Sequence, residues 1–318
     1  MNKQLLKLGT RGSRLALWQA ETVKALVQQA NPDLALEIVS ITSSGDLDRT
    51  KPLEQLGGEG LFTKELEHEL QQGTIDFAVH SLKDLPTVLP EGFVLSAVPQ
   101  RGPVEDALVS GNGGGLESLP RGATVATGSP RRKAQLLHLR SDLNVTGLRG
   151  NVPTRLEKLE TEDLDGIVLA KAGLERLGFG HRITEVFPTD RFCPAVGQGA
   201  IGIEIREGDQ TALNATSAID HPETHAAVQA ERGFLAGLGS GCSLPVGAHA
   251  QLDNAAQPAF LTLAGVVLNR QGTERLAADM TGPVGKAWEL GERLAELLVG
   301  QGGMNLLQDP DRGPSHSG

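Results

Sequence analysis

The sequence predicts an α/β protein that has two similarly built α/β domains and a smaller α+β domain at its C-terminal end. Over the first two thirds, short apolar runs alternate with helical patterns, which is typical of α/β domains. A Gly-Ser turn followed by a helix start occurs twice after such a run, as "TRGSR" at Thr10 and "TGSPR" at Thr127. The repeat is short, so a chance resemblance of two glycine-serine turns is the alternative. The last third changes to a helix, two strands and an amphipathic helix.

The first predicted domain starts with a strand–turn–helix–strand unit. The apolar run 5–8 ends in a glycine-bracketed turn, and the helical pattern over 14–30 begins directly after Ser13. A serine oxygen there accepts a hydrogen bond from a free amide of the first turn, so we expect Ser13 to be the N-cap. The other elements expected here are an extended segment over 36–41, a helix over 63–71 and strands over 77–80 and 93–98.

A second unit begins near Arg101 and repeats this design. We expect Ser129 to cap a helix whose first residue is Pro130, because a proline loses no hydrogen bond at that position. The other elements expected are a loop over 111–115 ("GNGGG"), strands over 123–127, 144–148 and 166–170, and a helix over 154–159. The last third should hold helices over 222–235 and 286–299 and strands over 260–268 and 275–279.

These elements divide the 318 residues into three predicted domains, a reasonable number for this length. Domain 1 is expected to span 1–99 together with 200–217, domain 2 to span 100–199, and domain 3 to span 218–308. The polar tail 309–318, "DPDRGPSHSG", is expected to be disordered because it has too few apolar residues to join a core.

The composition argues against several classes of function. The chain has 39 acidic and 29 basic residues, a net charge of −10, and an aromatic fraction of 3%. Nucleic acids and anionic membranes attract basic surfaces, and base stacking needs aromatic side chains, so we expect neither kind of partner. No apolar run reaches the length of a membrane span, and the N-terminal stretch MNKQLLKLGTRG has no apolar signal region, so we expect a cytoplasmic protein. Nothing in the pattern indicates an extended interface, so we expect a monomer.

The common metal and nucleotide motifs are missing from the sequence, which has no C-x-x-C, H-E-x-x-H or Walker A pattern. His221 and His225 are four residues apart, but we expect Asp220 to be an N-cap with Pro222 at the first helical position, which places His221 off the helix face. We therefore expect no metal. Cys193, which precedes a proline in "RFCPAVGQG", is expected to be structural, and both cysteines should be free.

Basic residues stand at the starts of the predicted helices, where the helix dipole disfavours them. They are Arg11 and Arg14 around Ser13, Arg131, Arg132 and Lys133 after Ser129, and Arg149 and Arg155 near a further helix start. Free amides together with arginines at a helix N-terminus form an anion site, and arginine binds carboxylates through two parallel hydrogen bonds. A ligand with several carboxylates would fit this arrangement. The alternative is a set of solvated surface arginines.

Two turns carry side chains suited to chemistry. "HSLKDLP" (80–86) places Lys83 and Asp84 after a strand, and an aspartate in an arginine-rich pocket stays ionised, stabilises a developing cation and guides proton transfer. "GSGCSLPVG" (239–247) places Cys242 at the tip of a glycine-bracketed bend, where a reagent can reach the thiol. An ordinary turn and an incidental loop cysteine are the alternatives. "GGEGLF" (57–62) is either a mobile lid or a plain surface loop.

Six motifs in this order, spread over essentially the whole chain, resemble the porphobilinogen deaminase family, also called hydroxymethylbilane synthases. They are TRGSRLALWQ (10–19), HSLKDLP (80–86), ATGSPRRKAQL (126–136), GLRGNVPTRLEKL (147–159), AVGQGAIGIE (195–204) and GSGCSLPVGAHA (239–250). The resemblance implies that domains 1 and 2 are of the type II periplasmic-binding-protein kind and that the third domain carries a cofactor cysteine on a loop. It also implies a transferase of tetrapyrrole (haem) biosynthesis, which joins four porphobilinogen molecules head to tail, releases ammonia each time and yields the linear hydroxymethylbilane.

The same resemblance assigns roles to residues. A dipyrromethane cofactor would be attached to Cys242 through a thioether, and its carboxylates would be held by Lys83, Ser129, Arg131, Arg132 and Arg155. Incoming substrate and the growing chain would be bound by Arg11, Ser13, Arg149, Arg155 and Arg176. Asp84, with Lys83 and Arg11 beside it, would face the pyrrole nitrogens and stabilise the cationic azafulvene-type intermediate left when ammonia departs. Glu59 stands where many members have lysine, which puts a lid contact from that position in doubt.

Two other functions remain open on the residues alone. Two arginine-lined α/β domains also suit an anion-binding module or the effector domain of a regulator, although we find no signal region or helix-turn-helix segment. A transferase that uses Cys242 directly as its nucleophile is the other, although no histidine base stands near that turn in sequence. A covalently loaded Cys242 would argue against the binding module, and stability of that load through turnover would argue against the cysteine nucleophile.

Overall fold

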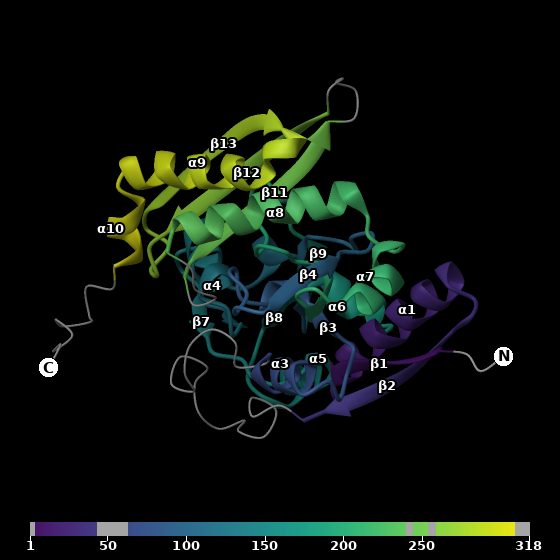
Figure 1. The fold of residues 1–318 in the computed structure, drawn as a ribbon. Helices are drawn as coiled ribbons and strands as arrows, with labels where there is room; N and C mark the ends of the chain where they lie inside the picture. The colour runs from purple at the N-terminus through teal and green to yellow at the C-terminus, as the bar shows by residue number, and fades with distance from the viewer. Residues whose placement is uncertain (1–3, 43–62, 240–243, 254–258, 309–318) are drawn as a thin grey trace, which may run out of the picture.

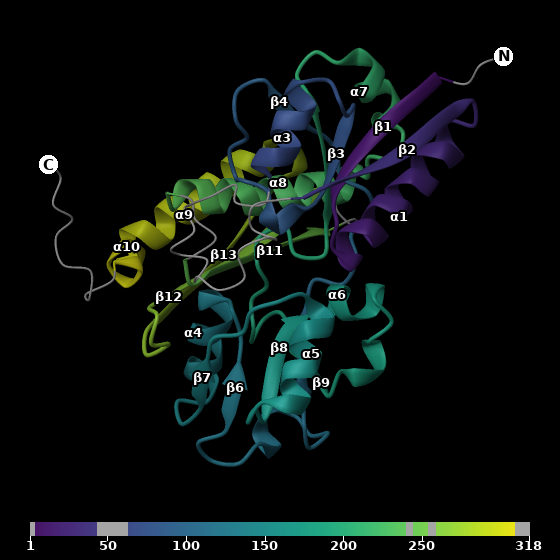
Figure 2. The ribbon, with the colours of Figure 1, turned by 90° about the horizontal axis from the view of Figure 1, so that it is seen from below.

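The structure is a computed structural model that describes residues 4–42, 63–239, 244–253 and 259–308. Its elements form two five-stranded sheets and one three-stranded sheet (Figure 1). Figure 2 shows the first two sheets in separate halves of the molecule, with β1–β3 on one side and β6–β9 on the other. The α/β class and the α+β character of the C-terminal part are confirmed.

The first sheet has the order β2-β1-β3-β10-β4. Its strands are β1 (Gln4–Arg11), β2 (Leu34–Ile41), β3 (Phe77–Ser81), β4 (Phe93–Ala97) and β10 (Ile201–Arg206). It packs with α1 (Arg14–Ala30), α3 (Lys64–Gln71) and α7 (Gln210–Ser217). β1 pairs in parallel with β2 and β3, whereas β10 runs antiparallel between β3 and β4. The apolar faces of these strands and of α1 form one buried core.

The second sheet repeats this design with the order β7-β6-β8-β5-β9. Its strands are β5 (Asp106–Ser110), β6 (Thr124–Ala126), β7 (Asn144–Thr146), β8 (Gly166–Ala170) and β9 (Glu185–Val186). Its helices are α4 (Pro130–Leu139), α5 (Val152–Thr161) and α6 (Lys171–Arg176). β6 pairs in parallel with β7 and β8, and β5 is the antiparallel strand between β8 and β9. The equal topology of both sheets supports the expectation of two similar domains.

The chain crosses between the two sheets twice, from β4 to β5 and from β9 back to β10. The two crossings lie side by side, because the backbone N–H of Gly102 donates to the carbonyl of Gly199 at 3.1 Å. The backbone at Gly199 has a positive φ of 83°, and a Cβ there would stand 2.7 Å from the carbonyl oxygen of Gly102, so only glycine fits. These crossings agree with the predicted return of the chain to domain 1 near residue 200. The predicted domain limits themselves stay a proposal.

The C-terminal part is an antiparallel sheet, β11 (Val246–Asp253), β12 (Phe260–Leu268) and β13 (Arg275–Pro283), packed against two helices. These helices are α8 (Pro222–Gly237) and α9 (Ala287–Gly300), and the short α10 (Gly303–Leu307) follows. α8 and α9 approach closely at two glycines. A Cβ on Gly233 would stand 2.4 Å from the carbonyl oxygen of Trp288, and one on Gly291 would stand 2.2 Å from that of Ala230.

One predicted cap is wrong. His221, not Asp220, is the N-cap of α8, because its Nδ1 accepts a hydrogen bond from the backbone N–H of Thr224 at 3.2 Å. Asp220 binds other groups instead: its Oδ1 accepts from the backbone N–H of Val98 at 2.7 Å and contacts Nδ1 of His225 at 2.8 Å.

Among the helices of the described residues, none has both the length and the apolar composition that crossing a membrane would require.

Candidate active site

Most of the predicted site residues that the structure describes lie where parallel strands of both sheets end and helices begin. Ser13 caps α1, accepting from the N–H of Ala16 at 3.2 Å, and Ser129 caps α4, accepting from the N–H of Arg132 at 3.4 Å. Both caps are as predicted from sequence. β3 ends in the 3₁₀ turn Leu82–Asp84, which carries Lys83 and Asp84. The carboxyl ends of strands in open α/β sheets are where ligands usually bind.

A cavity of about 70 Å³ opens at this edge of the first sheet. It is lined by Arg11, Ser13, Leu15, Ala16, Gln19, Thr63, Val79, His80, Ser81 and Asp84. Three of the predicted site residues, Arg11, Ser13 and Asp84, are thus brought together. Gln19 was not predicted; it is 2% exposed, and its Nε2 donates to Oγ of Ser81 at 2.9 Å. In the sequence, Gln19 is spaced with Ala16 and Val23 on the apolar face of the predicted helix, and this polar residue among apolar ones is the signal that could have indicated it.

On the side of the second sheet, Arg131 and Arg132 converge on a buried carboxylate, Asp106 at the start of β5. Arg131 Nη1 lies 2.8 Å from Asp106 Oδ2, and Arg132 Nε donates to Asp106 Oδ1 at 2.9 Å. Gln198 Nε2 also donates to this Oδ1 at 2.9 Å. All four side chains are buried, so one carboxylate, which the sequence analysis missed, balances part of the charge of the two arginines at the start of α4.

The pKa values show that these groups act on one another across the two sheets. Burial alone raises the pKa of Asp106, but the charges of Arg131 and Arg132 outweigh it and hold the pKa well below its usual range. Burial, followed by the positive charge of Arg132, lowers the pKa of Lys83 to about 8, although Asp84 and Asp106 oppose this shift. Lys83 therefore shares one electrostatic neighbourhood with Arg131 and Arg132 of the second sheet.

Arg155 belongs to the same neighbourhood. Burial, followed by the charge of Arg132, lowers the pKa of Arg155 to about 10; Asp84 opposes the shift and Arg149 adds to it. Its Nε donates to the carbonyl of Gly150 at 2.7 Å, at the start of α5, which Asn151 caps. The structure thus brings together Lys83, Asp84, Arg131, Arg132, Arg149 and Arg155, and we call this set with Asp106 the cationic cluster.

The cationic cluster has the chemistry of a site for carboxylates. Among the residues that the structure describes, the set comprises two anions, Asp84 and Asp106, and five cations, which are Lys83, Arg131, Arg132, Arg149 and Arg155. In the part of the chain that the structure describes, the buried Nε of Arg131 also has no hydrogen-bond partner. A desolvated excess of positive charge is costly unless an anion balances it. A ligand that carries several carboxylates therefore fits these residues.

Arg176 has different surroundings. Its Nη2 donates to the carbonyl of Gly199 at 2.6 Å, and its guanidinium lies 5.2 Å from the ring centre of Trp18 on α1. Burial lowers the pKa of Arg176. The residue therefore connects α6 with the crossing segment and with the first sheet's helix. Its predicted role in substrate binding stays a proposal.

Both cysteines were predicted to have distinct roles, and the structure describes one of them. Cys193 is 4% exposed, and burial raises the pKa of its thiol to about 12, as expected of an unreactive structural cysteine. Its backbone carbonyl accepts from Arg131 Nη1 at 2.6 Å. Cys242 lies outside the described residues, as do Glu59 with the rest of the 57–62 segment and the tail 309–318.

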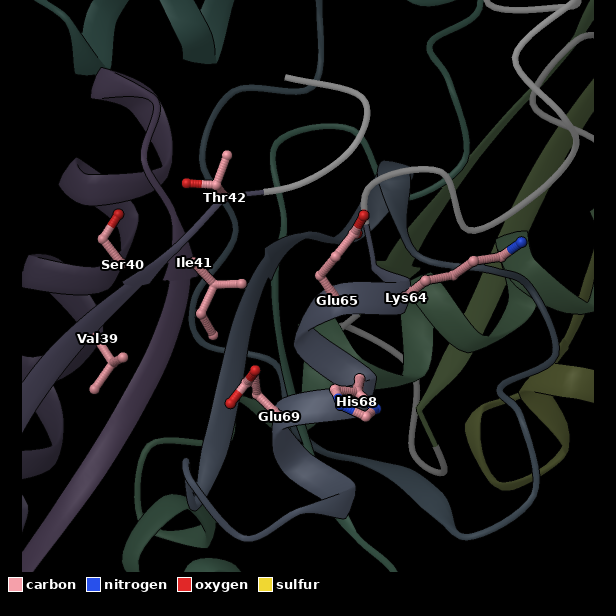
Figure 3. Close-up of a pocket in the computed structure, with 8 residues that line it drawn as sticks. All are labelled: Val39, Ser40, Ile41, Thr42, Lys64, Glu65, His68 and Glu69. Atoms are coloured by element: carbon pink, nitrogen blue, oxygen red, sulfur yellow. The ribbon is translucent and has the colours of Figure 1, made fainter. Parts of the chain in front are cut away.

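A larger cavity of about 560 Å³ lies between the end of β2 and α3 (Figure 3). Lys64, Glu65, His68 and Glu69 of α3 line one side, and residues 39–42 line the other. None of the predicted site residues lines it, and its charged side chains are of both signs. We assign the site to the smaller cavity and the cationic cluster because the chemistry of the side chains, rather than volume, decides.

Comparison with known proteins bears on this assignment. Residues 6–214 match the family "Porphobilinogen deaminase, dipyromethane cofactor binding domain", and residues 225–300 match "Porphobilinogen deaminase, C-terminal domain". Over 315 residues the chain is 45% identical to porphobilinogen deaminase of Syntrophotalea carbinolica, covering 99% of each chain. Over 307 residues it is 46% identical to that of Desulforamulus reducens, covering 96% of this chain and 98% of the relative.

Among solved structures, a YaeC-family lipoprotein from Enterococcus faecalis matches 70% of this chain and 93% of its own, at 11% identity and a TM-score of 0.41. The family matches together span nearly the whole chain, and the relatives are similar over their full length. The chain belongs to the porphobilinogen deaminase family.

Proposed function

We propose that this protein joins four porphobilinogen molecules head to tail, releases one ammonia at each addition and yields the linear tetrapyrrole hydroxymethylbilane. The observation that carries the proposal is the cationic cluster, a partly buried excess of positive charge around Asp84 where strands of both sheets end. Each porphobilinogen brings an acetate and a propionate, so a growing chain needs many cationic partners. The family named by the comparisons is the second support.

The dipyrromethane cofactor of this family fits the residues present. Its carboxylates would be held by Lys83, Arg131, Arg132 and Arg155 together with Ser129, which adds a hydroxyl and the free amides of the α4 N-terminus. When bound, the dipyrromethane supplies the pyrrole carbon at which chain growth starts. Asp106 holds Arg131 and Arg132 in place from behind, so their orientation is fixed before any ligand binds.

Substrate binding is proposed for Arg11 and Ser13 at the small cavity and for Arg149, Arg155 and Arg176 on the facing domain. Asp84 lines the same cavity as Arg11, so a carboxylate and a guanidinium stand at one end of the proposed substrate. The role proposed for Asp84 is to stabilise positive charge on a pyrrole nitrogen as ammonia leaves. Lys83, the neighbour of Asp84 in the 3₁₀ turn, and Arg11, which lines the same cavity, are proposed to act beside it.

We also propose that the protein works as a monomer in the cytoplasm, without metal, nucleic acid or membrane. The net charge of −10 supports this for anionic partners, because they would be repelled from most of the surface. The concentration of cations in one cluster makes the site the exception to that surface.

Intact-mass measurement of the purified wild type beside Cys242→Ser tests the proposed function. We expect the wild type to be heavier than its sequence by two linked pyrrole units and the serine variant to match its bare sequence, because a hydroxyl at this position does not form the thioether. Cys193→Ser is the matched control and should keep the added mass, since its thiol is buried with a raised pKa.

If the wild type and Cys242→Ser both have the mass of the sequence alone, the masses are measured again after incubation with porphobilinogen. An apoprotein should then gain the two units at Cys242. A wild type that gains no mass and forms no hydroxymethylbilane would contradict the proposal and leave an anion-binding module as the better explanation. An added mass that disappears during turnover would instead favour Cys242 as a transient nucleophile.

The lowered pKa of Lys83 predicts proton uptake on ligand binding. Its pKa of about 8 lies below the ordinary value of 10.5, so above pH 8 the free site holds a neutral amine. A bound carboxylate favours the ammonium form, so binding should take up about one proton at pH 9 and far less at pH 6.5, and affinity should fall roughly tenfold between pH 7 and 9. Calorimetry of apoprotein with a pyrrole that has both carboxylates but no aminomethyl group, in buffers of different ionisation enthalpy, measures this.

Lys83→Arg is the control, because a guanidinium stays charged over this range. It should bind the same pyrrole with little proton uptake at pH 9. Equal uptake by wild type and variant would show that another group titrates.

The lowered pKa of Lys83 also affects the free energy of unfolding. The pKa in the folded protein lies below the value in the unfolded chain, so burying the charged amine costs stability. This cost is fully present below pH 8 and is relieved as pH rises toward 10.5.

A further inference from the structure

A buried histidine–carboxylate pair lies at the wall of the small cavity, and neither member was given a role above. His80 is the fourth residue of β3, and its Nε2 lies 2.9 Å from Oε2 of Glu204 on β10. The side chains are 3% and 0% exposed. In the β3–β10 ladder His80 is opposite Gly202, so Glu204, two residues on, is its diagonal neighbour on the same face of the sheet.

This pair connects β3, which leads into the 3₁₀ turn with Asp84, with β10, which follows the second sheet in the chain. His80 itself lines the cavity together with Arg11, Ser13 and Asp84. Four residues later in the chain, Asp84 ends the 3₁₀ turn that follows β3. On the other side of that turn, Arg232 of α8 donates to the carbonyls of Pro86 and Thr87 at 2.7 and 2.8 Å. The turn is therefore fixed at both of its ends.

The cost of burying the Glu204 carboxylate indicates that the pair does more than fill space in the core. Oε1 of Glu204 and Oε1 of Glu67 on α3 are both buried without a hydrogen-bond partner in the described part of the chain. Burial, and then the nearby charge of Glu204, raise the pKa of Glu67, although Thr63, His80 and Lys64 oppose the shift. A fully buried carboxylate and imidazole with a half-buried second carboxylate nearby are costly, and apolar side chains of the same size would pack there without that cost.

We propose that His80 is a positioning residue for the reaction: its hydrogen bond to Glu204 fixes the cavity wall and the turn from which Asp84 acts. The inference rests on the proposed function, because Asp84 needs its position only if it meets a substrate. An error of 1 Å in a reacting group lowers rates by about a hundredfold, so loss of this hydrogen bond should appear in kcat. Substrate affinity, which depends on the arginines, should change little.

Three substitutions of His80 separate the hydrogen bond from the packing. In His80→Gln the amide can still donate to Glu204, in His80→Leu the volume stays but the donor is lost, and in His80→Asn the amide is too short to reach. His225→Leu is the control, because His225 and Asp220 form a histidine–carboxylate pair at 2.8 Å that is more exposed and does not line the cavity. Turnover of porphobilinogen is measured per folded, cofactor-loaded molecule, with loading taken from intact mass and folding from circular dichroism.

The glutamine variant should keep kcat within about threefold of the wild type, whereas the leucine and asparagine variants should lose roughly 10–100-fold at nearly unchanged KM. His225→Leu should keep the wild-type kcat. If the leucine variant fails to fold, the comparison of asparagine with glutamine decides. If kcat of the leucine and asparagine variants lies within twofold of kcat of the glutamine variant, the inference is overturned. Turnover by the wild type would in that case still support the proposed function. A wild type without turnover would overturn both.

Discussion

Asp84→Asn should lower kcat for porphobilinogen by roughly 10²–10³-fold and leave the fold intact. Removal of one preorganised electrostatic stabiliser from a desolvated site typically has an effect of this size. Asparagine has the shape of aspartate but no charge, so it cannot balance a positive charge that develops on a pyrrole nitrogen. The carboxylate acts on Lys83 and Arg155 in the cationic cluster, so its loss also leaves those cations less compensated.

The measurement is kcat of the cofactor-loaded variant, with loading confirmed by intact mass and stability by thermal unfolding. Asp33→Asn is a matched control, because Asp33 is exposed in the turn between α1 and β2, and this variant should keep normal activity. An Asp84→Asn protein that is loaded with cofactor and turns over at a near-normal rate would remove Asp84 from the reaction.

The sequence was sufficient to predict those parts of the fold and site that depend on local signals. The helix over 14–30 and both serine caps are correct because a short polar side chain before an apolar helical pattern determines a helix start within a few residues. β5 (Asp106–Ser110) was missed because all five residues are buried and the run has no alternation of polar and apolar side chains. β10 and β11 were also missed, although both alternate apolar with polar or glycine residues, as in the run IGIEIR of β10.

Side chains that act across long separations could not be predicted. Asp106 meets Arg131 and Arg132 from 25 and 26 positions away, and nothing near it in sequence indicates two arginine partners. Glu204 and His80 are 124 positions apart in the sequence, because the strands of the second sheet lie between β3 and β10 in chain order. Most of the predicted cations lie in one cluster, with Arg176 apart from it, and the buried anion Asp106 beside two of them is visible only in the structure.

Asp106→Asn should lower the free energy of unfolding by about 3–5 kcal/mol, the usual cost of removing one partner from a buried ion pair. Asp106 is fully buried; its Oδ1 accepts from Arg132 and Gln198, and its Oδ2 forms an ion pair with Arg131 at 2.8 Å. An asparagine offers only one accepting oxygen, so its NH₂ group would face a donor. Two buried guanidinium groups would then share a space without any anion.

Denaturant unfolding of the apoprotein measures this loss, and Asp142→Asn is the matched control. Asp142 also binds an arginine through both oxygens, Arg140 at 2.9 and 2.7 Å, but at the surface, so its loss should be much smaller. The pKa of Asp106 is depressed in the folded state, so its contribution is present above the ordinary value of 3.8 and is lost as pH falls below it. The wild type should therefore lose more stability in acid than Asp106→Asn does. Equal losses for the two asparagine variants at pH 7 would show that Arg131 and Arg132 are balanced by some other group, and that their orientation does not depend on Asp106.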